Sequence, residues 1–239
     1  SHGETVAEVF PQWLRLAWKR GHYYHAYDLN MPALIPNRPM EHFRYDPPLS
    51  EHGYLSAEVA GHSIKLAGYE PVVIYSSPEL RCVQTASAII RAFAPTTIQI
   101  CIEPSLADWV QFTPQDISKQ WLVPQQFSQL GYPVNSLYKP FLSEVPASES
   151  PDDYLRRLSR FFNAISEPSK RVAVVVTNAH AISAARDAPW TSVEQLCQVS
   201  ERRHLSVVGT ELQKHRFEQL PTQAKFQSFD VLPKSSTSA

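Results

Sequence analysis

The sequence predicts an α/β domain in which helices cover both faces of a mostly parallel sheet, forming a three-layer α/β/α sandwich. Short β-branched runs at 71–76 and 171–177 have the length and composition of strands. The second run, RVAVVVT, is continuously apolar, which is typical of a parallel strand that is buried on both faces. Helical segments separate the runs along the chain, so strands and helices alternate as this architecture requires.

The N-terminal third combines two expected helices with a long loop. Residues 6–18 are apolar and aromatic, and Pro11 stands near the start of the helix expected there. Residues 19–49 lack a clear periodicity and hold five prolines, and a loop of that length inside a compact domain is usually functional. Ser50 is a suitable cap for a helix over 51–67, which Gly68 can end.

The middle of the chain repeats the alternation. Strand 71–76 is followed by Pro78, which suits the first position of a helix. Residues 98–102 predict the next strand, and Asp108 lies in the loop after it. Residues 111–149 give no clear assignment.

The C-terminal third begins with a strong helix start, in which Ser150, Pro151 and two acids follow one another. Strand 171–177 comes next. The remaining predicted elements are a helix over 192–199, strands over 205–212 and 214–220, and a polar tail over 233–239. We expect a single domain over 1–232.

Composition excludes several classes of function. The 22 Lys and Arg residues and 23 Asp and Glu residues give a net charge of −1, which provides no general basic surface for nucleic acid. The seven glycines form neither a P-loop nor a dinucleotide fingerprint, so a phosphate site would consist mainly of side chains. The three cysteines include no C-x-x-C pair, and no apolar run reaches about 18 residues. We therefore expect a cytoplasmic protein that binds neither nucleic acid nor membrane; the first residues show no signal peptide.

Two candidate site residues follow strands directly, where open α/β sheets bind their ligands. Arg81 lies in the first turn of the helix after 71–76. A cation is unfavourable there unless an anion joins it, so backbone amides and a guanidinium predict a phosphate site. His180 follows strand 171–177. A solvent-facing arginine and a structural histidine are the alternatives for these two residues.

Further candidates lie elsewhere in the chain. His2 stands beside a glycine before the first helix, and Asp108 is a possible general acid, although most loop acids are simply solvated. His22 and His25 could be two metal ligands, but no third ligand stands at a recognisable spacing. We predict neither a metal nor a cofactor.

Taken together, five short motifs resemble the histidine phosphatase superfamily, which has the phosphoglycerate-mutase-like fold. The branch that the sequence most resembles is the phosphatase domain of the suppressor of T-cell receptor signalling proteins and the ecdysteroid-phosphate phosphatases. The motifs are His-Gly-Glu at 2–4, Asp-Pro-Pro-Leu-Ser at 46–50 with Gly53, Ser-Ser-Pro-Glu-Leu-Arg-Cys-Val-Gln-Thr-Ala at 76–86, Glu-Pro-Ser-Leu-Ala-Asp-Trp at 103–109 and Ala-His at 179–180. The resemblance extends from residue 1 to about 232.

The resemblance implies a metal-independent phosphomonoesterase. His2 would accept the phosphoryl group as a phosphohistidine, Arg81 and His180 would bind the phosphate, and Asp108 would protonate the leaving oxygen. Water would then release inorganic phosphate. The substrate would be a phosphorylated small molecule or a phosphoprotein, with the 19–49 loop setting specificity, and the protein would be a homodimer.

The sequence also departs from the family pattern. Ser1 and Thr5 stand where arginines are usual, and Asp108 replaces a glutamate. In the family a strand precedes the histidine motif, and we would expect that strand before residue 1. Two hypotheses therefore stay open at this point: a phosphatase of reduced activity, or a pseudophosphatase that acts as a phosphate-ligand-binding, dimerisation or scaffold module.

Overall fold

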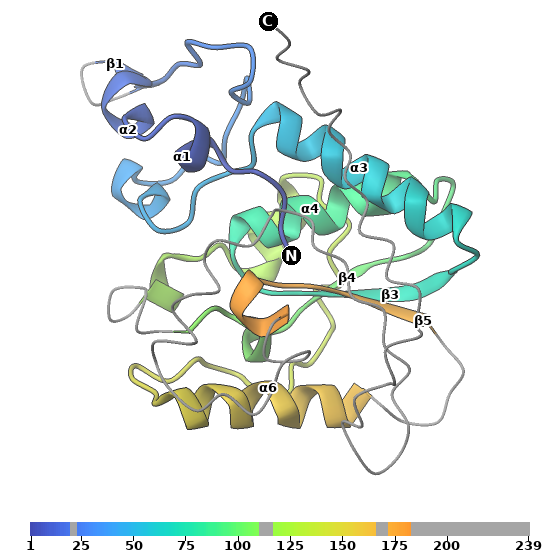
Figure 1. Cartoon of the computed structure of the whole chain (residues 1–239). Coiled ribbons are helices and arrows are strands. Elements are labelled where there is room, and N and C mark those ends of the chain that lie inside the picture. The colour runs from blue at the N-terminus through green and yellow to red at the C-terminus, as the bar shows by residue number, and fades with distance from the viewer. Residues whose placement is uncertain (20–22, 110–116, 166–171, 183–239) are drawn as a thin grey trace, which may run out of the picture.

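The computed structural model of the chain describes residues 1–19, 23–109, 117–165 and 172–182. Within these residues a parallel sheet lies between two helical layers (Figure 1). Helices α3 (Glu51–Leu66) and α4 (Leu80–Arg91) cover one face, and α6 (Pro151–Ile165) covers the other. The predicted three-layer sandwich is thus confirmed.

The sheet contains three strands in the order β4 (Ile100–Ile102), β3 (Pro71–Ser76) and β5 (Val172–Val176), all parallel. Ser76 pairs with Ile102 on one side and with Val176 on the other, so the three carboxyl ends lie at one edge. In β5, Val174 packs against the α3–α4 layer and Val175 against the α6 layer, which explains the continuous apolar run. The expected strands over 98–102 and 171–177 are both present with shorter bounds.

The helix expected in residues 6–18, with Pro11 near its start, is shorter than that segment. The chain forms two short helices, α1 (Val6–Val9) and α2 (Trp13–Leu16). Pro11 lies between them, and a proline inside a helix has no N–H to donate and clashes with the preceding turn. At the start of the 19–49 loop, strand β1 (Trp18–Lys19) pairs with strand β2 (Tyr23–Tyr24). The later part of the loop contains the 3₁₀ helix η1 (Met40–Phe43).

The start of α3 agrees with the prediction, whereas the start of α4 does not. The Ser50 hydroxyl accepts a hydrogen bond from Gly53 N at 2.9 Å, and Gly68 has the positive φ of 82° expected just after a helix end. Helix α4 begins at Leu80, two residues later than Pro78 suggested. Its first turn is held by Asp46, whose Oδ1 accepts from Leu80 N at 2.7 Å.

The remaining elements include three short helices in stretches where no helix was expected: η2 (Pro104–Leu106), η4 (Ile117–Gln120) and α5 (Pro124–Gln129). Helix α6 starts as predicted, with Asp153 N donating to the Ser150 hydroxyl at 3.2 Å. The predicted helix over 192–199, the late strands and the tail lie outside the described residues. None of the helices in the described part of the chain is long and apolar enough to cross a membrane.

A close approach of two backbones fixes the N-terminal segment on α3. A Cβ atom at Gly53 would lie 2.2 Å from the carbonyl oxygen of Glu4. The same oxygen accepts a hydrogen bond from Ser50 N at 3.0 Å, so it cannot move aside freely. Glycine at this position therefore holds the segment that contains His2 against the α3 helix.

We expect Gly53→Ala to lower the free energy of unfolding by about 1–3 kcal/mol, because the added methyl group overpacks a backbone contact. The sign is informative, since alanine at an unhindered helix position would stabilise by about 0.5–1 kcal/mol. Urea unfolding measures the difference. Ser63→Ala, a change at a half-buried serine of the same helix whose hydroxyl donates to Val59 O, is the control. A Gly53→Ala protein as stable as the parent would contradict the prediction.

Candidate active site

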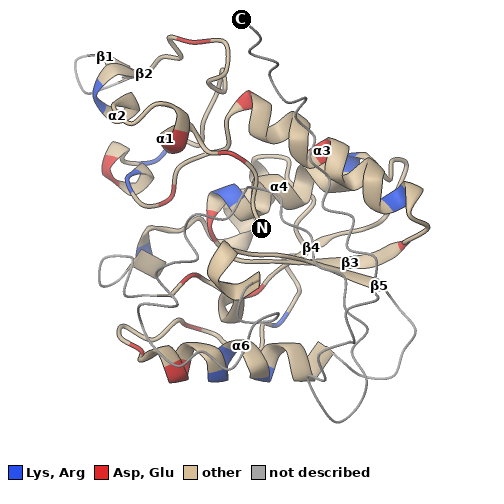
Figure 2. Cartoon of the chain, viewed as in Figure 1, with Lys and Arg blue, Asp and Glu red and all other residues tan. Residues whose placement is uncertain are grey.

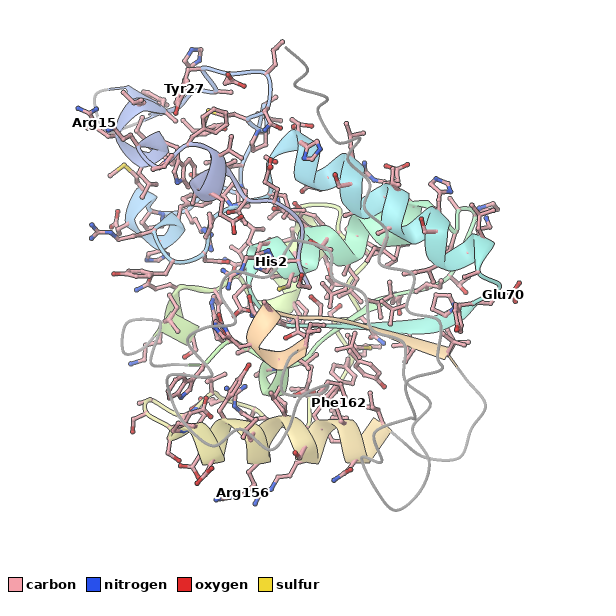
Figure 3. The ribbon with its side chains drawn as sticks, viewed as in Figure 1. His2, Arg15, Tyr27, Glu70, Arg156 and Phe162 are labelled. Carbon is pink, nitrogen blue, oxygen red and sulfur yellow. The ribbon has the colours of Figure 1, made fainter. Side chains whose placement is uncertain are left out.

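The segments that follow strands β3 and β5 are bound together at the carboxyl edge of the sheet. His2 N donates to Thr177 O at 3.1 Å, and Ser77 N donates to Val176 O at 2.9 Å. The hydroxyls of Thr177 and Ser77 lie 2.8 and 2.9 Å from the same acceptor, Leu106 O. The segment leading to Asp108 is therefore attached to the ends of both strands, beside His2 (Figure 3).

Asp108 and His180 form a direct pair. Asp108 Oδ1 lies 2.9 Å from His180 Nδ1, and both side chains are largely buried. Burial by itself raises the pKa of Asp108, but the hydrogen bond and charge of His180, with the charge of Arg81, lower it below the usual value. Asp108 is thus a carboxylate at neutral pH and orients the imidazole of His180.

Arg81 is buried rather than solvent-facing, which removes the simple alternative for this residue. Its Nε and Nη2 donate to Asn178 Oδ1 at 3.1 and 2.7 Å, and Nη1 donates to Tyr45 O at 3.3 Å. Burial opposes the charged form, but nearby Glu79, Asp108 and other acidic groups raise the pKa of Arg81. The guanidinium therefore keeps its positive charge inside the fold.

Glu79 connects these residues, although sequence reasoning did not identify it as a site residue. Its Oε1 accepts from Asp108 N at 3.0 Å and from Asn178 Nδ2 at 3.2 Å, and lies 3.7 Å from Arg81 Nη2. Its Oε2 accepts from the Ser77 hydroxyl. Burial raises the pKa of Glu79, while Arg81 opposes that rise. The position of Glu79, just after a buried strand, was the one feature that could have indicated it.

His2 is joined to the same edge through the backbone. Its Nδ1 lies 2.8 Å from Gly3 O, and a carbonyl only accepts, so Nδ1 carries the proton and Nε2 of the neutral ring keeps its lone pair. Gly3 N donates to the Thr85 hydroxyl at 3.0 Å, and that hydroxyl donates to Arg81 O at 2.8 Å. The sequence-predicted residues thus reach one edge: Asp108 contacts His180, Arg81 is connected to both through Glu79 and Asn178, and His2 is connected to Arg81 through Thr85.

Positions 1 and 5, where arginines are usual in the family, hold side chains without positive charge, Ser1 and Thr5. Thr5 is buried, and its hydroxyl and backbone N donate to Glu8 Oε2 at 2.6 and 2.7 Å at the start of α1. Arg38 is also buried but pairs with Asp46 at 2.8 Å. Among the described arginines, Arg81 is the one whose charge lowers the pKa of Asp108.

The loop that carries Asp108 is held from the α6 side by Arg157. Arg157 Nη1 donates to Ser105 O at 2.9 Å and to Ala107 O at 3.0 Å. Its Nε and Nη2 donate to the Glu149 carboxylate at 3.0 and 2.5 Å. This buried ion pair places the residue just before Asp108, so α6 contributes to the geometry of the site.

The described residues contain no group of three or more His, Cys, Asp or Glu side chains suited to a metal ion. His22 lies outside the described residues. In the view of Figure 2, positive and negative residues are interspersed over the described elements, which show no continuous basic face.

The chain belongs to the histidine phosphatase superfamily. The model of branch 1 of this family matches residues 39–218, a range that contains Arg81, Asp108 and His180 and leaves out His2. The arrangement of the parallel sheet, its helices and these polar residues agrees with that assignment.

Two relatives place the chain more closely. Ubiquitin-associated and SH3 domain-containing protein A from Mus musculus is 32% identical over 163 residues, which are 65% of this chain and 26% of that protein. Ecdysteroid-phosphate phosphatase from Bombyx mori is 27% identical over 187 residues, which are 76% of this chain and 28% of that protein. The chain thus spans about a quarter of the length of the curated relatives it matches.

A solved structure has the same fold. The ecdysone phosphate phosphatase from the same silkworm, in complex with tungstate, superimposes with a TM-score of 0.70 at 23% identity and covers 81% of each chain. This likeness, together with the family match, confirms the predicted phosphoglycerate-mutase-like fold.

Proposed function

We propose that the chain is a phosphomonoesterase of reduced activity that works through a phosphohistidine at His2. The observation that supports this function is the buried Arg81, which is connected to the Asp108–His180 pair on one side and to the segment of His2 on the other. A buried guanidinium that is connected by hydrogen bonds to the segments of both histidines suits a phosphoryl group, whose oxygens it can bind while the imidazole attacks.

The proposed reaction has two steps. His2 Nε2 attacks the phosphorus, the bond to the ester oxygen breaks, and the leaving oxygen takes a proton. Water then attacks the phosphohistidine and releases inorganic phosphate. The leaving oxygen takes its proton from Asp108 in its protonated form, and the attacking water returns a proton to the Asp108 carboxylate in the second step. Because the pKa of Asp108 is lowered, this form is a small fraction at neutral pH, which is consistent with a slow reaction.

The reduced rate follows from the charge of the site. Positions 1 and 5 hold serine and threonine, and the described site holds two buried carboxylates, Glu79 and Asp108, around one guanidinium. A transferring phosphoryl group needs positive charge, and the loss of one preorganised donor typically costs about 10²–10³ in rate. The same observation favours the alternative function, a pseudophosphatase that binds a phosphorylated ligand without turnover.

We expect His2→Ala to abolish the hydrolysis of p-nitrophenyl phosphate, because no phosphohistidine can form without the imidazole. Rapid quenching of the parent with a labelled substrate should trap an acid-labile, base-stable phosphoprotein that is absent from His2→Ala. His62→Ala, at an exposed histidine on α3, is the control and should keep the parent rate.

Three results would separate the two functions. Turnover and labelling that depend on His2 support the phosphatase. Tungstate binding without either supports the pseudophosphatase. Turnover that persists in His2→Ala would contradict the assignment of the nucleophile.

The finer expectations stay predictions that rest on the family resemblance. They are a phosphorylated small molecule or phosphoprotein as substrate, a homodimer, and a cytoplasmic location. The name of the silkworm relative suggests steroid phosphates as one substrate class for the first screen, beside phosphotyrosine.

A further inference from the structure

Glu79 is a second charged group buried beside the one arginine of the described site. It is 2% exposed, Arg81 is 9% exposed, and Glu79 Oε1 lies 3.7 Å from Arg81 Nη2. A carboxylate this close offsets most of the field that Arg81 would otherwise exert on an incoming anion. Since water is largely excluded, the interaction is screened less than at the surface.

The carboxylate of Glu79 is held in place. It accepts hydrogen bonds from Asp108 N at 3.0 Å, from Asn178 Nδ2 at 3.2 Å and from the Ser77 hydroxyl. It cannot swing away when a phosphate arrives without leaving buried donors unsatisfied. Burial raises the pKa of Glu79, but these donors and Arg81 favour its charged form, so an anion at Arg81 would bind against a negative charge that is held in place.

We propose that Glu79 determines the phosphate affinity of this site: its buried carboxylate neutralises Arg81 and keeps the binding of phosphate and phosphate-like anions weak. The proposal rests on the proposed phosphate site and adds the residue that sets its strength. Under this proposal the site keeps its arginine and both histidines while its affinity for anions is low.

Glutamine at position 79 separates the charge from the structural contacts. Its amide oxygen can accept from Asp108 N and Asn178 Nδ2, as Oε1 does now. The Ser77 hydroxyl can then turn its proton from residue 79 to Leu106 O, which lies at 2.9 Å, and accept from the new amide N–H. Only the negative charge is lost, and the repulsion between residues 79 and 108 is relieved at the same time.

Calorimetric titration of the parent and of Glu79→Gln with sodium tungstate and with inorganic phosphate tests the proposal. We expect Glu79→Gln to lower the Kd for tungstate by about tenfold or more, because a unit charge a few ångströms from the anion is removed. Glu70→Gln, at an exposed glutamate far from His2 in Figure 3, should leave the Kd unchanged. Glu79→Asp keeps the charge and should stay close to the weak parent affinity.

The proposal is overturned when Glu79→Gln binds tungstate no more tightly than the parent, or when Glu79→Asp gains as much affinity as Glu79→Gln. Glu79→Ala, measured by the same titration and by the thermal shift with tungstate, is the second variant if the glutamine protein does not fold. These binding results do not depend on turnover. The proposed function fails instead if the parent protein forms no phosphohistidine at His2. The two failures are therefore distinguishable, because one is seen in anion binding and the other in labelling.

Discussion

Replacing Arg81 by alanine should lower kcat/KM for p-nitrophenyl phosphate by about 10²–10³ and raise the Kd for tungstate at least tenfold, as expected for one preorganised charged donor. Arg81 is the arginine at the described site, and both neighbouring carboxylates, Glu79 and Asp108, would then stand without their cation. The loss should therefore exceed that of an arginine in a site with several cations. Steady-state kinetics and calorimetry measure the two effects.

Arg91→Ala is the matched control because Arg91 lies at the other end of the same helix, exposed, and 4.0 Å from Glu58. Its removal should change neither quantity. Arg81→Lys should recover little, since an ammonium cannot hold Asn178 Oδ1 with two donors and bind phosphate oxygens at the same time. Equal tungstate affinities of the parent and Arg81→Ala would contradict the phosphate site.

Arg157→Ala is expected to lower the free energy of unfolding by about 3–5 kcal/mol, the usual cost of removing one partner of a buried ion pair. The Glu149 carboxylate, whose side chain is 1% exposed, would be left buried without its cation. The carbonyls of Ser105 and Ala107 would lose their donor as well. Urea unfolding followed by circular dichroism measures the change.

The neighbouring Arg156→Ala gives the comparison within one helix. Arg156 makes an exposed ion pair with Asp153 at 3.0 Å, and such surface pairs contribute about 0–1 kcal/mol. If Arg157→Ala were no less stable than Arg156→Ala, the ion pair with Glu149 would not be what holds the loop of Asp108.

The long 19–49 loop has a structural part at the site in addition to its predicted part in specificity. Tyr45 O accepts from Arg81, and Asp46 accepts from the first N–H of helix α4 while pairing with Arg38. The end of the loop therefore places the helix that carries Arg81. Substitutions of Arg38 or Asp46 should therefore affect the position of helix α4 as well as the loop itself.

Local signals in the sequence were sufficient where neighbouring residues decide the structure. Helix α3 begins after the Ser50 cap and ends before Gly68, and α6 begins at Pro151, directly after Ser150. The β-branched runs form the strands. Capping, the φ angle and side-chain branching each act over a few neighbouring residues, so the local sequence is enough to predict these features. The positions of Arg81, Asp108 and His180 after the predicted strands were enough to predict that these residues lie at one edge of the sheet.

Contacts between distant segments decided the rest. Helix α4 starts at Leu80 because Asp46, 34 residues earlier, supplies the acceptor. The ionised state of Asp108 depends on His180, 72 residues later. Apart from its position just after a strand, Glu79 is marked as a site residue only by its donors Asp108 and Asn178, the latter 99 residues away. No local pattern encodes these pairs, since burial and charge at a site arise from the packing of segments that the chain brings together only on folding.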